Sequence, residues 1–122
     1  MNQDQRQAIA STVTGFFQEL GAQLEEYSEG RAVVGLTLTG KHMNNASSLH
    51  GGVTASLLDI AMGLCGTWAA SPQERRVAIT LSLNTNFTST APVGTHVRAE
   101  PDRSEWRSRS LDRSRFCWRW LS

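Results

Sequence analysis

The apolar positions of this chain change their period several times, and each period predicts a different kind of element. Close to the N-terminus, apolar residues recur three and four positions apart, as they do on one face of a helix. A glycine follows the last of them at position 21, and glycine commonly ends helices. The pattern predicts a short amphipathic helix built on Ile9, Val13, Phe16, Phe17 and Leu20.

Two later segments alternate apolar and polar residues, which is the period of a strand with one buried face. The first covers residues 31–38, and the second covers residues 77–87. The second is about ten residues long, enough for a strand that curves around a buried helix. Another strand is expected over residues 95–100, after the turn at residues 92–94.

The segment between these strands, from Gly52 to about Trp68, is apolar on nearly all sides. A helix without a polar face is a buried helix. Polar loops at residues 41–49 and 71–74 flank it. The order of elements predicts an α+β fold in which an antiparallel sheet wraps around one central helix. Cys65 lies inside this helix, where we expect a buried, unreactive thiol.

The start of the buried helix carries the candidate chemistry. Paired glycines, Gly51 and Gly52, bring backbone N–H groups and the positive end of the helix dipole close to a ligand. Asp59 is the one carboxylate in the apolar run that follows, and such a group is costly unless it is paired, protonated or used. One segment thus combines backbone N–H groups that can bind an electrophile with a carboxylate. Together these two features favour hydrolysis as the reaction.

These residues also carry a resemblance to a known family. Asn44, His50-Gly51-Gly52 and Asp59, followed by a strand around Thr80, resemble the hotdog-fold acyl-CoA thioesterases. The phenylacetate-pathway branch of the 4-hydroxybenzoyl-CoA thioesterase superfamily is the most similar. Residues 49–59 and 86–94 match that branch closely, and the resemblance covers roughly residues 31–100.

The resemblance implies a hotdog fold and hydrolysis of an acyl-CoA to a free acid and coenzyme A, with no metal or redox cofactor. It places the Gly51 N–H on the thioester carbonyl, assisted by Asn44, and one such donor is typically worth about 3 kcal/mol. The carboxylate of Asp59 then activates water or attacks the carbonyl itself. Thr80 falls where relatives carry a hydroxyl that positions the water. His50 and Gly52 complete the substrate-binding turn.

Each of these positions also has a purely structural interpretation. Asp59 can be an acid that hydrogen-bonds a neighbouring chain, and the glycines can serve close packing. His50 suits a helix cap better than a base, and Thr80 can be an ordinary strand residue.

The spacing of the two central groups adds an argument about assembly. Gly51 and Asp59 are eight residues apart, which is about 12 Å along a helix. A reacting carbonyl must lie about 3 Å from both partners. Two antiparallel helices across a two-fold axis satisfy this requirement, with Gly51 of one protomer facing Asp59 of the other. We therefore expect a homodimer with shared active sites, or a homotetramer that contains such dimers.

Composition narrows the remaining choices. The formal net charge is +1, which argues against a nucleic-acid partner, and two cysteines are too few for a disulfide framework. Residues 1–7 lack the apolar core of a signal peptide, and no stretch approaches transmembrane length. We expect a cytoplasmic protein without a membrane partner. His42 and His96 have no partners at metal-ligand spacing, so no metal site is predicted.

The last 22 residues differ from the rest. Residues 1–100 hold six Lys/Arg and eight Asp/Glu, whereas residues 101–122 hold six Arg, three acids and three of the four tryptophans. We expect a hotdog domain over residues 1–100, and an atypical tail where relatives have two further strands. Residues 111–114 can be encoded so that a one-base shift reads Trp-Ile-Glu-Ala, which suggests a changed reading frame near residue 100. A genuine basic-aromatic segment that contacts an acidic partner is the alternative.

Two other functions remain open at this level. The chain can be an acyl-CoA-binding hotdog protein without turnover, or the inactive product of a disrupted frame. A hotdog hydratase acting on enoyl-CoA would need an Asp/His pair in a different order of segments.

Overall fold

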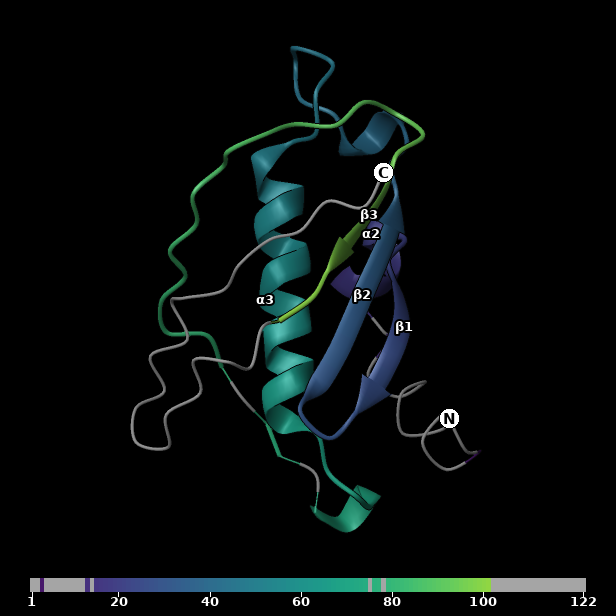
Figure 1. The fold of residues 1–122 in the computed structure, drawn as a ribbon, viewed down its shortest axis with the longest axis vertical. Coiled ribbons are helices and arrows are strands. Elements are labelled where there is room, and N and C mark those ends of the chain that lie inside the picture. The colour runs from purple at the N-terminus through teal and green to yellow at the C-terminus, as the bar shows by residue number, and fades with distance from the viewer. Residues whose placement is uncertain (1–2, 4–12, 14, 75, 78, 102–122) are drawn as a thin grey trace.

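The computed structural model describes residues 3, 13, 15–74, 76–77 and 79–101. Within these ranges the chain forms two longer layers, a sheet and a helix, with short helical turns around them (Figure 1). In chain order the elements are α2 (Phe16–Leu20), β1 (Gln23–Ser28), β2 (Arg31–Thr37), η1 (Gly40–His42), α3 (Gly51–Thr67), η2 (Pro72–Glu74) and β3 (His96–Ala99).

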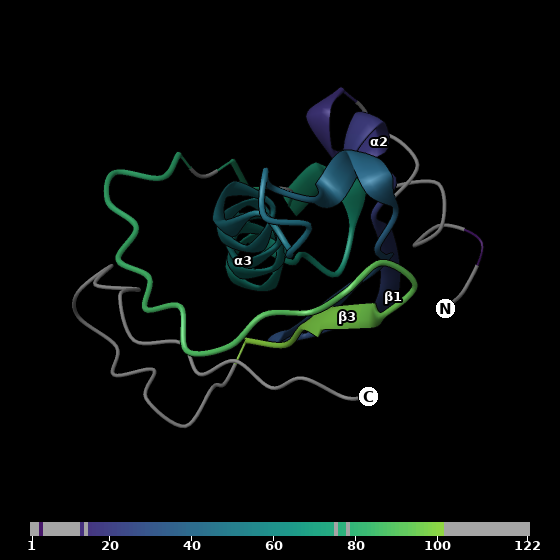
Figure 2. The ribbon, with the colours of Figure 1, turned by 90° about the horizontal axis from the view of Figure 1, so that it is seen from above.

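The three strands form an antiparallel sheet in the order β1-β2-β3, so β2 is central. A tight turn at residues 29–30 joins β1 to β2, and Gly30 adopts a φ of 67° there. Across β2, Val34 lies opposite Leu24 of β1 and Ala99 of β3. One face of this sheet packs against α3, as Figures 1 and 2 show from two directions.

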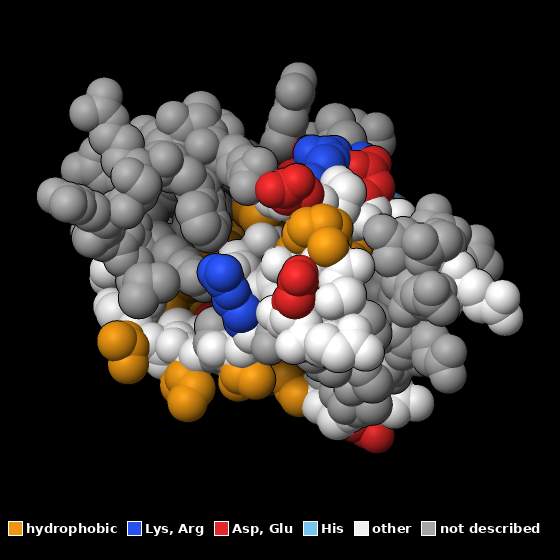
Figure 3. Space-filling view, turned by 90° about the horizontal axis from the view of Figure 1, so that it is seen from below, with side chains coloured by type: hydrophobic (Ala, Val, Ile, Leu, Met, Phe, Trp, Pro, Cys, Tyr) orange, Lys and Arg blue, Asp and Glu red, His pale blue; other side chains and the backbone are white. Residues whose placement is uncertain are grey.

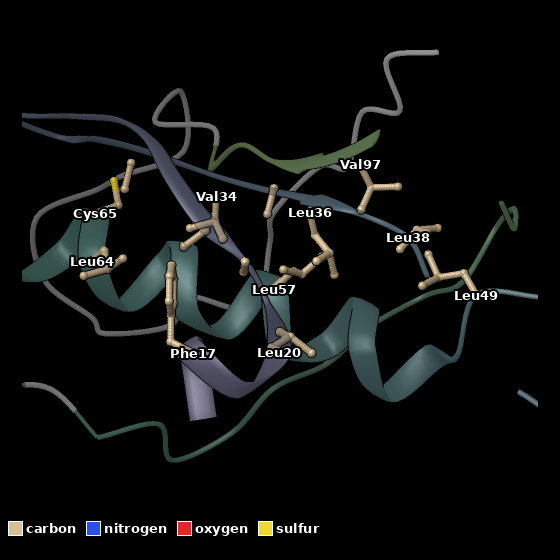
Figure 4. Packing of buried hydrophobic residues seen from close by; sticks show 14 of the residues in the cluster. Phe17, Leu20, Val34, Leu36, Leu38, Leu49, Leu57, Leu64, Cys65 and Val97 are labelled. Carbon is tan, nitrogen blue, oxygen red and sulfur yellow. The ribbon is translucent and has the colours of Figure 1, made fainter. Parts of the chain in front are cut away.

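The core lies between α3 and the sheet. Val34 and Leu36 of β2 are 0% and 2% exposed, and Leu57 of α3 is 1% exposed. Figure 4 shows side chains from these elements meeting in this layer, with Phe17 and Leu20 of α2 beside them. Full burial of one such side chain contributes about 1.5–3 kcal/mol.

Several elements agree with the sequence analysis. The buried helix runs from Gly51 to Thr67, and the Cys65 side chain is buried within it. The first helix ends at Gly21, which is left-handed with a φ of 80°, although its predicted start at Ile9 lies outside the described residues. The expected strands at residues 31–38 and 95–100 are β2 and β3. The predicted tail beyond residue 101 is likewise outside the description.

One strand was not predicted. In β1 the register shifts between Leu24 and Glu26, so Glu25 is an extra residue on that strand. A bulge of this kind breaks the two-residue alternation. Leu24 and Tyr27 therefore both pack against the core although they are three positions apart.

The prediction of a strand over residues 77–87 is wrong. The described residues of this segment form no strand, and Val77, Ile79 and Leu81 are 89%, 83% and 93% exposed. Seen from below, hydrophobic side chains gather along one side of the surface (Figure 3). The alternation is present, but a strand also needs a neighbour to bond its backbone, and no described residue pairs with this segment.

Among the described helices, none has the length and apolar character needed to cross a membrane.

Candidate active site

The N-terminus of α3 has a defined set of free and occupied N–H groups. His50 is the N-cap, and its Nδ1 accepts a hydrogen bond from the Gly52 N–H at 2.8 Å. The His50 carbonyl accepts from Val53 N at 3.0 Å and from Thr54 N at 3.3 Å. The N–H of Gly51 has no acceptor among the described residues. It is therefore the open donor at the positive end of the helix dipole.

His50 acts here through its ring nitrogen as an acceptor. Since Nδ1 accepts from Gly52, a neutral ring carries its proton on Nε2. This bond makes His50 a cap that shapes the turn, and it also occupies the Gly52 N–H. Of the two glycines, Gly51 is the one that presents an open donor.

A buried histidine, His42, holds the turn that precedes the site. Its Nδ1 accepts from the Thr39 N–H at 2.9 Å, and its Nε2 donates to the Leu20 carbonyl at 2.7 Å. Its own carbonyl accepts from the His50 N–H at 2.9 Å. His42 is 2% exposed and thus joins the end of α2 to the cap of α3. From the sequence, His42 was said only to lack partners at metal-ligand spacing, and its structural role was not predicted. The signal for that role is Thr39 three residues earlier in a capping box.

Asn44 lies in the exposed loop before α3, with its amide oriented by that loop. Its Oδ1 accepts from the Ala46 N–H at 2.9 Å and from the Ser48 N–H at 3.1 Å. Because the oxygen is used in this way, the Nδ2 group is the part of the amide left to donate to a ligand. A pocket of about 390 Å³ opens here, lined by Met43, Asn44, Asn45, Ala46 and His50.

Asp59 and Thr80 form the second cluster. The Thr80 hydroxyl donates to Asp59 Oδ1 at 2.5 Å, which joins the third turn of α3 to the irregular segment that follows η2. Asp59 is half-buried, and its second oxygen, Oδ2, accepts no hydrogen bond from the described residues. The arrangement leaves one carboxylate oxygen held and the other open.

Phe87 is a neighbour of Gly51 that the sequence analysis did not single out. Its ring carbons lie 3.3–3.7 Å from the point that a Cβ on Gly51 would occupy. The ring therefore packs on the bare Cα at the start of α3. Phenylalanine has no acidic, basic or nucleophilic group, so the sequence offered no reason to choose this residue as part of a site.

The structure brings these residues together in two groups on one helix. Asn44, His50, Gly51 and Gly52 lie at its N-terminal end, whereas Asp59 and Thr80 lie about 12 Å further along at 1.5 Å per residue. Within one protomer the open N–H and the carboxylate are therefore too far apart to share one carbonyl. The described residues contain no group of three His, Cys, Asp or Glu side chains that could hold a metal ion.

Comparison with known proteins gives a family and a set of relatives. The profile of a domain of unknown function, DUF4442, matches residues 3–115. A protein of Archaeoglobus fulgidus named "Putative esterase" is 31% identical over 84 residues, which are 69% of this chain and 51% of that protein. The chain thus spans about half the length of this relative.

Solved structures are similar as well. The phenylacetic acid degradation protein PaaI from Thermus thermophilus, in a mutant form, has a TM-score of 0.60 at 26% identity, over 70% of this chain and 69% of that chain. The PaaI protein of E. coli has a TM-score of 0.66 at 24% identity, over 79% and 66%. Zebra fish thioesterase superfamily member 2 has a TM-score of 0.61 at 21% identity, over 78% and 67%.

The last two structures, at these identities, show the fold alone. Together the comparisons confirm the fold predicted from the sequence. The antiparallel sheet and central helix are those of the hotdog fold, and the chain is similar to PaaI-like proteins and to thioesterase superfamily members.

Proposed function

The chain belongs to the family of the domain of unknown function DUF4442, and we propose that it is a thioesterase that hydrolyses an acyl-CoA to a free acid and coenzyme A. The observation that supports this most is the pair of groups on α3. The open N–H of Gly51 is suited to an electrophilic carbonyl, and the carboxylate of Asp59 is suited to activating its attacker. The relative named as an esterase agrees with this class of reaction.

The N-terminal cluster would bind the carbonyl oxygen. The Gly51 N–H donates to it, and the Asn44 Nδ2 group, whose partner oxygen is already occupied, is a second donor. Negative charge develops on this oxygen when the carbonyl carbon becomes tetrahedral. One donor placed at that point typically lowers the barrier by about 3 kcal/mol.

The second cluster would supply the attacking oxygen. As a general base, Asp59 takes a proton from water while the water oxygen bonds to the carbonyl carbon; the C–S bond then breaks, and the sulfur leaves as the coenzyme A thiol after it takes a proton. As a nucleophile, the carboxylate bonds to the carbonyl carbon and the C–S bond breaks, so that an acyl anhydride forms and the coenzyme A thiolate leaves and takes a proton from solvent. Water then hydrolyses the anhydride to the free acid and restores the carboxylate. In both routes the Thr80 hydroxyl fixes Oδ1 and orients the open oxygen.

A complete site needs a second copy of the chain. The separation of about 12 Å along α3 keeps Gly51 and Asp59 of one protomer apart. An antiparallel pair of α3 helices would place Gly51 of each protomer beside Asp59 of the other. The proposal is thus a homodimer with two shared sites, either alone or within a homotetramer, that works on acyl-CoA in the cytoplasm.

Release of coenzyme A tests the proposal. The protein is incubated with aromatic, short-chain and long-chain acyl-CoAs, and free thiol is measured against the same protein carrying Asp59→Asn. Turnover that depends on Asp59 is expected with at least one acyl group. Acyl-CoA binding without any release would instead support the non-catalytic alternative.

A further inference from the structure

Phe87 places an exposed apolar surface beside Gly51, the residue whose N–H is open. The side chain is 58% exposed, although its ring carbons lie within 3.3–3.7 Å of the Cβ position on Gly51. One edge of the ring is thus buried against the helix, and the rest of the ring is exposed to solvent. Such a surface gains free energy when a ligand covers it.

The segment that carries Phe87 is attached to the rest of the protein on both sides of the ring. Thr80 bonds to Asp59 at one end, and at the other the Ala91 carbonyl accepts from the Leu49 N–H at 3.1 Å. The chain from Thr80 to Phe87 can reach about 23 Å when extended, whereas the helix between their contact points is about 12 Å long. The segment therefore bows away from α3, as Figure 2 shows, although the Phe87 ring contacts the helix at Gly51.

We propose that Phe87 determines acyl specificity by forming an apolar wall for the acyl group. The inference rests on the proposed function, in which the substrate carbonyl accepts a hydrogen bond from Gly51. A carbonyl in that position brings the first carbons of its acyl chain to the ring. Acyl groups with an apolar body then cover the open part of Phe87, whereas an acetyl group is too small to do so.

The expected consequence is a preference for larger apolar acyl groups that depends on this one ring. A hydrophobic wall that contacts a few methylene groups discriminates by about tenfold or more. The quantity to measure is therefore a ratio between two acyl groups in one protein. Partial unfolding of a variant lowers both values together and leaves the ratio unchanged.

Binding of two non-hydrolysable ketones tests the proposal without need of turnover. S-acetonyl-CoA and S-(2-oxononyl)-CoA each keep the carbonyl, lack the scissile bond and differ in the length of the acyl body. Calorimetry gives the affinity of each for the wild-type protein, for Phe87→Ala and for Phe87→Leu. The matched control is Phe16→Ala on α2, which removes a ring of comparable exposure, 63%, away from the Gly51 contact.

We expect the wild-type protein to prefer the longer ketone and Phe87→Ala to reduce that preference about tenfold. Phe87→Leu should reduce the preference for the longer ketone by a smaller factor, and Phe16→Ala should leave this preference unchanged. An unchanged ratio in folded Phe87→Ala, or no preference in the wild-type protein, would overturn the role of Phe87. If the ratio falls as expected while no acyl-CoA is hydrolysed, the wall stands and the proposed hydrolysis fails.

Discussion

At the scale of single residues, the side chain of His50 decides which backbone N–H of α3 is open. His50→Ala removes the acceptor of the Gly52 N–H, and loss of an N-cap acceptor typically costs about 1 kcal/mol in the free energy of unfolding. His50→Asn keeps an acceptor at the cap and should retain most of that stability. Urea denaturation of the two variants measures the difference. An equal loss in both would contradict a capping role.

Asp59 is the residue on which proposed turnover depends most. Asp59→Asn should lower kcat by a factor of at least about a hundred, since general-base and nucleophilic roles are commonly worth that much. The half-buried position and the bond from Thr80 tolerate an amide, so the fold should remain intact. Coenzyme A release and circular dichroism on the same sample check both points. Near-normal turnover by a folded variant would refute the role.

The sequence identified the residues at this scale by type, and the structure added their bonding state. Glycines before an apolar helix and a carboxylate within it are visible in one sequence. Which glycine N–H remains open depends on a side-chain bond from His50, and the position of Phe87 depends on the path of a remote segment. Neither follows from spacing, because both are tertiary contacts.

At the scale of elements, helices were easier to predict than strands because a helix bonds within itself. The limits of α3 follow from its apolar run and its glycines. A strand depends on a partner, and in spite of the alternation over residues 77–87 the described residues of this range form no strand. In β1 a bulge at Glu25 hid the alternation from the sequence.

Gly35 shows how closely the outer face of the sheet is packed. A Cβ at this position of β2 would overlap the Glu25 carboxylate, and it would lie 2.9 Å from His96 Nε2. That carboxylate reaches across β2 to pair with His96 at 2.5 Å and with Arg98 at 2.8 Å, both on β3. The strands β1 and β3 are thus bridged over a residue that has no side chain.

Gly35→Ala should lower the free energy of unfolding by about 1 kcal/mol, because the displaced carboxylate loses partners that are each worth up to about that much near a surface. In a Glu25→Ala protein, Gly35→Ala should lower the free energy of unfolding much less, because the carboxylate that occupies the Cβ position is absent. Chemical denaturation of the four proteins in this cycle measures the coupling. If the two substitutions change the free energy of unfolding additively, the Glu25 carboxylate is not what makes a side chain at position 35 unfavourable.

At the scale of the whole molecule, the distribution of the site over α3 leads to a complementation experiment. Asp59→Asn and Gly51→Val should each be inactive, since every shared site then either lacks the carboxylate or has a valine side chain that obstructs the residue 51 N–H. A heterodimer of the two variants has one site with both groups intact and one site with both lesions. Subunit exchange should therefore restore activity toward half of the wild-type value per heterodimer, as counting of sites requires.

Folding and dimerisation of each variant must be shown first, because a valine at Gly51 meets the Phe87 ring. Labelled subunits and mass spectrometry verify that heterodimers have formed. Verified heterodimers without any turnover would place the complete site within one chain.

The buried imidazole of His42 connects the N-terminal part of the chain to the cap of α3, where the proposed site begins. It accepts from Thr39, donates to the last turn of α2 and, through its carbonyl, receives the N–H of the cap residue His50. A shortened chain that begins after Leu20 leaves the ring N–H without its buried acceptor, which costs about 1–3 kcal/mol at that point. Removing residues 1–20 also takes Phe17 and Leu20 out of the core. The shortened chain should therefore lose both stability and turnover, and chemical denaturation and coenzyme A release measure the two losses.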